Sequence, residues 1–317
     1  MHKTGRCLGL CGLLLLLAGC AGTPQSDALL ADLPPRLARP VELTDTPFFP
    51  QEDYQCGPAA LATLLEASGI EVKPAALAPR VYLPARQGSL QVELQAAARS
   101  LGRIPYVIDP YLETLFSEVR DGHPVLVLQN LGTDWFPVWH YAVVVGYDLG
   151  AEEVVLRSGR FRRHIQDLPL FERTWARARH WGLLLVVPGE LTTTMAPLPY
   201  LRAVSGFAGQ SDRATLLRAW RAGVQRWPDF APLRMALGNT LYADDQREAA
   251  LAEFLTVLVR APDYAPAHNN AAQILLELGR LHAAGEHARE AVRLGGAHAG
   301  IYRQTLEAIQ RASGGSE

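Results

Sequence analysis

Residues 50–65 read PQEDYQCGPAALATLL and carry the clearest local signal in the chain. Apolar residues recur at helical spacing from Ala60 to Leu65, and Pro58 suits the first turn of a helix, where a missing N–H costs nothing. The pattern predicts a helix that begins beside Cys56. The partial positive charge at a helix N-terminus favours a thiolate, so we expect a lowered pKa for Cys56. The backbone N–H of Cys56 would be available to stabilise an oxyanion.

A cysteine nucleophile needs a partner that protonates the leaving group, and this partner is normally histidine. His140 lies in the run WHYAVVVGY, residues 139–147, which is apolar and rich in β-forming residues. A histidine at the mouth of a buried strand can be a structural core residue. Because Cys56 is predicted at a helix start, however, His140 is the candidate general acid/base. The other histidines after the N-terminal segment lie in turns, charged stretches or helical repeats: His123, His164, His180, His268, His282, His287 and His298.

Together the two motifs, Gln-(x)₄-Cys-Gly-Pro-Ala-Ala-Leu and His-Tyr-Ala-Val-Val-Val-Gly-Tyr-Asp, resemble those of the bacteriocin-processing cysteine peptidases, family 39 of the papain-like clan. The resemblance covers about residues 44–188. It implies an α+β fold in which a helical half bearing the nucleophile packs on an antiparallel sheet bearing the histidine. Local patterns agree, because they predict helices near 57–68, 89–101 and 111–120 and strands near 124–129, 139–147, 153–157 and 182–187.

The resemblance also implies roles for individual residues. Cys56 would be the nucleophile and His140 the general acid/base. Gln51 matches the glutamine whose amide binds the oxyanion, with Gln55 as the alternative because the family spaces this residue variably. A surface loop amide is the alternative interpretation of Gln51.

The third catalytic position departs from the family pattern. The family places an aspartate after the second strand to orient the imidazole, and Ser158 stands at that position here. A hydroxyl can accept a hydrogen bond from His140 but cannot stabilise an imidazolium by charge. Asp148 is a possible substitute, although we expect it at the far end of the strand. A cysteine enzyme depends less on this carboxylate, because its pair can rest as thiolate and imidazolium.

Residues 1–20, MHKTGRCLGLCGLLLLLAGC, form a positive start followed by a short apolar run, as in a secretory signal. The run is shorter than the roughly 20 apolar residues that span a bilayer. The sequence from Leu17 to Cys20 resembles the lipobox of bacterial lipoproteins, which implies a signal peptide over 1–19 and a lipidated Cys20 carrying diacylglycerol and a fatty acid such as palmitate. A conventional signal peptide with a chance cysteine is the alternative. By the same analogy Ala21 favours the periplasmic face of the outer membrane.

Three further segments follow. Proline-rich residues 20–43 are expected to be a tether and residues 189–210 a linker. Residues 211–317 read as helical and repeat with an offset of 34, since WPDFAP at 227–232 returns as APDYAP at 261–266. This period resembles tetratricopeptide repeats and predicts an all-α domain with repeats at 229–260 and 263–294, a preceding helix at 211–226 and a capping helix at 297–313. An unrelated helical bundle is the alternative.

Composition limits the function. A net charge of -2 and a pI near 6.5 give no basic field for nucleic acid. His282 and His287 are off the i, i+4 register of a helical metal site, no glycine-rich phosphate loop occurs, and no cofactor is expected.

The sequence therefore predicts a membrane-anchored cysteine peptidase acting on peptide or protein substrates, with repeats that recruit a protein partner or the substrate. A catalytically impaired, peptide-binding scaffold and an enzyme that transfers the acyl group to an amine are the alternatives.

Overall fold

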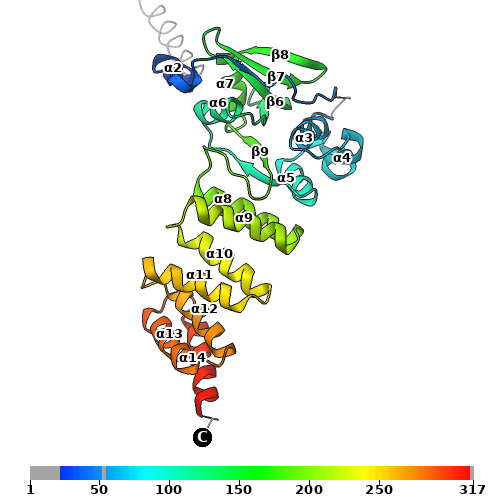
Figure 1. The fold of residues 1–317 in the computed structure, drawn as a ribbon. Coiled ribbons are helices and arrows are strands. Elements are labelled where there is room, and N and C mark those ends of the chain that lie inside the picture. Colours follow the sequence, from blue (N-terminus) through cyan, green and yellow to red (C-terminus); the bar gives the residue numbers. More distant parts are fainter. Residues whose placement is uncertain (1–21, 52–54, 315–317) are drawn as a thin grey trace, which may run out of the picture. The chain divides into compact units, whose positions relative to one another are not determined.

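The computed structural model describes residues 22–51 and 55–314, so Cys20 and the predicted signal peptide lie outside the described residues. The chain forms two compact units (Figure 1). The first unit runs to Val186 and includes Thr192–Thr194. The second unit contains Val187–Leu191 and the chain from Met195 onward. Within the described residues, no helix is long and apolar enough to cross a membrane.

An antiparallel seven-stranded sheet organises the first unit, with strand order β4-β9-β5-β6-β7-β8 and β1 paired to β6. The strands are β1 (Val41–Glu42), β4 (Ile104–Val107), β5 (Val125–Asn130), β6 (Trp139–Asp148), β7 (Glu153–Ser158), β8 (Phe161–Asp167) and β9 (Gly182–Val186). Strands β2 (Tyr82–Leu83) and β3 (Gly88–Ser89) form a separate hairpin. The four predicted strands correspond to β5, β6, β7 and β9.

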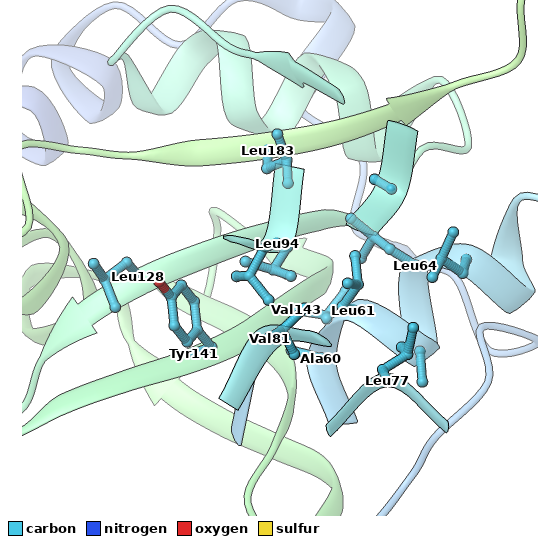
Figure 2. Packing of buried hydrophobic residues seen from close by; sticks show 14 of the residues in the cluster. Ala60, Leu61, Leu64, Leu77, Val81, Leu94, Leu128, Tyr141, Val143 and Leu183 are labelled. Atoms are coloured by element: carbon cyan, nitrogen blue, oxygen red, sulfur yellow. The ribbon is translucent and has the colours of Figure 1, made fainter. Parts of the chain in front are cut away.

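Four helices of the described chain pack against strands of this sheet: α3 (Cys56–Ala67), α5 (Gln91–Ser100), α6 (Leu112–Arg120) and α7 (Leu168–Ala176). Helix α2 (Pro24–Ala31) packs on α6 and α7, and α4 (Pro74–Val81) packs on α3 and α5. Figure 2 shows the core in which Leu61 and Leu64 of α3 meet Val143 of β6 and Leu183 of β9. This apolar contact fixes the start of α3 against the sheet. The predicted α+β fold, a helical part on an antiparallel sheet followed by an all-α region, is confirmed.

The expected tether is wrong, because most of its described residues are folded. The backbone N–H groups of Gln25 and Ser26 donate to the Glu172 carboxylate at 2.9 and 2.6 Å, so an anion satisfies the free donors at the start of α2. Val41 pairs with Tyr147 of β6. These contacts bind the segment before residue 44 to the body of the first unit.

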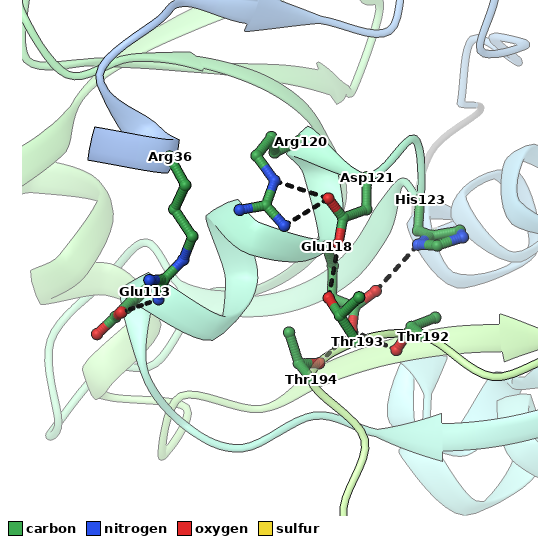
Figure 3. A network of polar contacts seen from close by, with 9 residues as sticks. All are labelled: Arg36, Glu113, Glu118, Arg120, Asp121, His123, Thr192, Thr193 and Thr194. Atoms are coloured by element: carbon green, nitrogen blue, oxygen red, sulfur yellow. Dashed lines mark hydrogen bonds and ion pairs between the residues drawn. The ribbon is translucent and has the colours of Figure 1, made fainter. Parts of the chain in front are cut away.

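The expected linker at 189–210 is also wrong. Figure 3 shows the threonines of 192–194 hydrogen-bonded within the first unit. Thr192 donates to the buried Glu118 carboxylate at 2.6 Å, Thr194 donates to the same oxygen, and Thr193 donates to Asp121 at 2.6 Å. Residues 197–207 then form a helix of the second unit.

The second unit is an array of paired helices. They are α8 (Pro197–Phe207), α9 (Arg213–Arg226), α10 (Ala231–Ala243), α11 (Arg247–Arg260), α12 (Ala265–Glu277), α13 (Leu281–Leu294) and α14 (Ala299–Gly314). Helices α8, α10, α12 and α14 begin at intervals of 34 residues, as do α9, α11 and α13. The pairs α10–α11 and α12–α13 match the two predicted repeats. Helices α8 and α9 add a third pair in the same register, which the sequence analysis had divided into a linker and a single helix.

Candidate active site

Cys56 is the first residue of α3, as the sequence predicts, and its side chain is partly buried. Its sulfur accepts hydrogen bonds from the backbone N–H groups of Cys56, Gly57 and Tyr141. Burial nevertheless raises the pKa of the Cys56 thiol, because desolvation of the thiolate outweighs these three donors. The expectation of a lowered pKa is therefore wrong in direction. The helix terminus supplies donors, but the apolar surroundings favour the neutral thiol.

His140 lies near the start of β6 and directly precedes Tyr141, whose N–H contacts the Cys56 sulfur. His140 and Cys56 line the same cleft, which has a volume of ≈ 800 Å³. Burial, and secondarily the charge of His164, lower the pKa of His140 from 6.5 to about 4. At neutral pH the cleft is therefore lined by an uncharged imidazole and an uncharged thiol.

The position of the orienting residue is occupied by Ser158, at the end of β7. Nε2 of His140 and Oγ of Ser158 lie 2.8 Å apart. Asp148 lies at the opposite end of β6, where its carboxylate accepts from the N–H groups of Gly150 and Ala151 at 3.0 Å. Eight residues of strand separate Asp148 from His140, roughly 26 Å along the strand. Of the two candidates, only Ser158 contacts the imidazole.

Ser158 is itself held in place by a neighbour that the sequence analysis did not single out. Arg157 is buried, and its guanidinium donates to the backbone carbonyls of Thr46 (3.3 Å), Thr44 (3.1 Å) and Arg162 (2.7 Å). A charged residue inside the otherwise apolar run of β7 was the available signal. Its hydrogen bonds join the chain before α3 to the strand that carries Ser158.

The two candidate glutamines are placed differently. Gln51 lines the cleft with Cys56 and His140, and its backbone N–H donates to the carbonyl of Gly159 at 3.1 Å. Gln55 lines a neighbouring hollow instead, which Gln51 also borders. The geometry therefore favours Gln51 over Gln55 as the side chain available to a substrate in the cleft.

Residues 43–180 match the model of the Peptidase_C39 like family. Because this match covers most of the first unit, we refer to that unit as the C39-like domain. A search of curated proteins returned no match.

Solved structures similar to parts of the chain fall into two groups. A putative C39-like peptidase from Bacillus anthracis is 20% identical over 47% of this chain and 98% of its own, with a TM-score of 0.39. The peptidase domain of Streptococcus ComA, a bi-functional ABC transporter involved in a quorum sensing pathway, is 22% identical over 44% and 98%, with a TM-score of 0.37. The first TPR of Spaghetti (RPAP3) bound to an HSP90 peptide is 12% identical over 37% and 93%, with a TM-score of 0.34.

Close packing around Cys56 in the C39-like domain explains Gly57. A Cβ on Gly57 would lie 2.3 Å from Oγ and 2.5 Å from Cβ of Ser89, on hairpin β2–β3. The hydroxyl of Tyr141 donates to the Ser89 carbonyl at 3.2 Å. The sequence analysis connected Cys56 and His140 but missed this hairpin, which borders the cleft between them.

The cleft of the C39-like domain has two further features that the sequence analysis did not identify. The β5–β6 connection contributes an apolar border, and three arginines line the cleft: Arg86, Arg177 and Arg179. Both features lie in irregular segments, where periodicity gives no signal.

Among the described residues, no group of three or more His, Cys, Asp or Glu side chains could hold a metal ion. His287, considered with His282 as a ligand pair, instead contacts His268, with the two Nδ1 atoms 2.9 Å apart.

Proposed function

We propose that the protein is a cysteine peptidase that hydrolyses peptide bonds through Cys56 and His140. The observation that carries the proposal is that these two side chains line one cleft. In addition, the Cys56 sulfur accepts a hydrogen bond from the backbone N–H of Tyr141, the residue after His140. The match of residues 43–180 to a peptidase family supports a peptidase-type activity.

The proposed reaction starts from a neutral thiol on Cys56 and a neutral imidazole on His140. When Nε2–H of His140 donates to the Ser158 hydroxyl, the lone pair on Nδ1 is free to accept a proton. In the proposed first step, the sulfur of Cys56 attacks the peptide carbonyl while its proton passes to Nδ1. The same proton is then given to the leaving amine. This route needs no resting thiolate, in agreement with the raised pKa of the thiol.

The negative charge that develops on the carbonyl oxygen needs donors. In the proposed site these are the backbone N–H of Cys56 and the side-chain amide of Gln51. After the amine leaves, a thioester remains on Cys56, and His140 takes a proton from the attacking water. A peptide amine could replace this water in the same geometry, which would give acyl transfer.

A second candidate function is a peptide-binding scaffold without turnover. The neutral Ser158 hydroxyl favours it, because no carboxylate stabilises a charged His140, whose pKa is lowered to about 4. In a scaffold the cleft would bind peptide while Cys56 stays unreactive.

Peptide hydrolysis by the full chain tests the proposal. The protein is incubated with a mixed peptide library in H₂¹⁸O, and the products are identified by mass spectrometry. We expect new carboxyl termini that carry ¹⁸O, and a loss of at least about 10³-fold for Cys56→Ala and for His140→Ala. His282→Ala is the matched control, because this histidine is 89% exposed and lies in the second unit. Products joined to an amine would establish transfer, and binding without any product would establish the scaffold.

The proposal extends to location and partners. A lipid on Cys20 would anchor the protein at a membrane, at the periplasmic face of an outer membrane by the lipobox analogy, and the helical array would hold a protein partner or the substrate. The sequence from Leu17 to Cys20 and the 34-residue period support these roles. Labelling with a fatty acid and membrane fractionation of wild type and Cys20→Ser test the anchor. Equal partition of both proteins into membranes would contradict it.

A further inference from the structure

The cleft beside Cys56 is lined by positively charged side chains that have no part in the proposed reaction. Its cationic lining residues are Arg86, Arg177 and Arg179, and the described residues that line it include no carboxylate. No ion pair joins Arg86 or Arg179 to another described residue, and both side chains belong to exposed residues. Arg177 donates to the carbonyls of Asn130 and Gly132, which leaves its charge without an anion. A substrate carboxylate would supply the missing charge.

The second feature is an apolar border formed by the segment 131–138, which connects β5 to β6, and by Trp139 at the start of β6. Three of its large side chains line the cleft although about half of each is exposed: Leu131 (48%), Val138 (56%) and Trp139 (52%). Apolar side chains grouped at a concave site typically contact a ligand. No described part of the chain covers this surface fully.

The apolar border is held in a fixed shape. The side-chain oxygen of Asn130 accepts from the N–H groups of Gly132 and Val138 at 3.0 and 2.9 Å. Thr133 accepts from the N–H of Phe136 at 3.1 Å, and a Cβ on Gly132 would lie 2.2 Å from the Phe136 carbonyl. A border that is already ordered loses little entropy when a side chain packs against it.

We propose that this cleft selects peptides that carry a bulky apolar side chain together with a carboxylate. The apolar side chain packs against Val138 and Trp139, and the carboxylate binds Arg86 or Arg179. The inference rests on the proposed function in one respect, namely that the ligand of the cleft is a peptide. A membrane surface is the competing occupant, because Trp135 and Phe136 at the tip of the same segment are 88% and 81% exposed. The peptide is favoured because the arginines and Trp139 line the cleft with Cys56 and His140, whereas Trp135 and Phe136 do not.

Binding to the full chain carrying Cys56→Ala tests the charge preference without turnover. Three fluorescein-labelled decapeptides share one tryptophan and differ only in two residues, which are Glu, Gln or Lys. We expect the Glu peptide to bind about tenfold more tightly than the Gln peptide at low salt, with the advantage falling to about twofold at high salt, because exposed charges are screened. The Lys peptide should bind most weakly. Equal affinities for the Glu and Gln peptides at low salt would overturn the proposal.

Substitutions at the arginines test whether Arg86 and Arg179 cause the preference for the Glu peptide. Arg86→Gln combined with Arg179→Gln should remove most of the preference for Glu. Arg39→Gln is the control, because Arg39 is exposed and does not line the cleft. A preference that survives the double variant would place the acidic site elsewhere and overturn the assignment.

The apolar half of the proposal is tested with a pair of tryptophans. Trp139→Ala should weaken the tryptophan peptide about tenfold relative to an alanine peptide, Trp139→Phe should restore most of the loss, and Trp135→Ala should change neither affinity. The same variants are sedimented with phosphatidylcholine–phosphatidylglycerol vesicles. Loss of vesicle binding in Trp139→Ala with unchanged peptide affinities would identify a membrane contact and overturn the proposal. Since binding is read without turnover, a failure of wild type to hydrolyse any peptide would contradict the proposed function alone.

Discussion

The two units of this protein differ in the sequence separation of the residues that they bring together. In the second unit, neighbouring helices repeat the same contact every 34 residues, so each helix pair packs mainly on the next. In the C39-like domain, the candidate site joins three residues that are far apart in sequence, Cys56, His140 and Ser158. The comparison shows why a substitution in the repeats should change stability, whereas a substitution at the site should change chemistry.

In two of the helix pairs a ring packs against a glycine, at different positions of the repeat. A Cβ on Gly238 of α10 would lie 2.6 Å from the ring of Phe254 on α11, and a Cβ on Gly223 of α9 would lie 2.7 Å from the ring of Tyr200 on α8. Such close approach lets two helices pack without a gap. The candidate site of the first unit has no comparable redundancy, because each proposed catalytic role falls on one side chain.

The largest effect should come from removing a ring in the repeats. Phe254 is 1% exposed, so Phe254→Ala should lower the free energy of unfolding by about 3–5 kcal/mol, through lost burial and the cavity left behind. Urea unfolding followed by circular dichroism measures the loss. Val259→Ala, at a residue that is 79% exposed on the same helix, should cost less than about 0.5 kcal/mol. Similar losses in both variants, or a loss of peptide binding in Phe254→Ala, would break the contrast between the units.

The stability of the C39-like domain should depend on pH because of His140. Burial lowers the pKa of His140 from 6.5 to about 4, so the unfolded chain binds more protons than the folded chain between these values. The contribution is fully present above pH 6.5 and is lost as the pH falls toward 4. It amounts to about 3 kcal/mol at most.

Urea unfolding between pH 7 and pH 4 measures this loss in wild type and in His140→Gln. The variant should have a shallower pH dependence, because glutamine does not titrate. Identical slopes for the two proteins would show that His140 is not the group responsible.

The next effect concerns the residue that faces the imidazole. Ser158→Asp should raise the pKa of His140, because a carboxylate 2.8 Å away would stabilise the imidazolium. We expect about a tenfold gain in kcat/KM at neutral pH and an acid limb of the pH profile that moves upward. Ser158→Ala should lower kcat/KM a few fold, since only a neutral hydrogen bond is lost. An acid limb that stays in place in Ser158→Asp would contradict the assignment of Ser158 to His140.

The smallest effect is expected at the other end of the same strand. Asp148→Asn should leave kcat/KM within about twofold of wild type, because its carboxylate accepts only from the N–H groups of Gly150 and Ala151. Peptide hydrolysis measured beside Ser158→Ala checks this. A tenfold loss in Asp148→Asn would return this residue to the list of catalytic candidates.

Sequence periodicity predicted the elements with a clear apolar pattern and missed several others. Helix α3 and strand β6 have clear apolar patterns, and the structure contains both. Strand β8 was missed because it is an edge strand with mostly exposed side chains, including consecutive arginines at Arg162 and Arg163. Helix α8 was missed because its prolines were interpreted as a linker, although its start at Pro197 lies one 34-residue period before Ala231.

The candidate site was predictable in its members and not in its electrostatics. Cys56, His140 and Gln51 were found from two motifs, and all three line one cleft. The direction of the pKa shift at Cys56 depends on how deeply the sulfur is buried, because desolvation outweighs the hydrogen bonds from three backbone N–H groups. Burial of this kind arises from tertiary packing, which a helix-terminus argument does not include.

The folded segment of α2 and β1 changes what a lipid on Cys20 would mean. With this segment packed on the domain, only residues 20–22 lie before Thr23, whose carbonyl already accepts a hydrogen bond from Asp27. Three residues extend at most about 10 Å. An acylated chain would therefore hold Thr23, just before α2, within about 10 Å of the lipid-bearing residue, and the domain would have little freedom to move away from the bilayer.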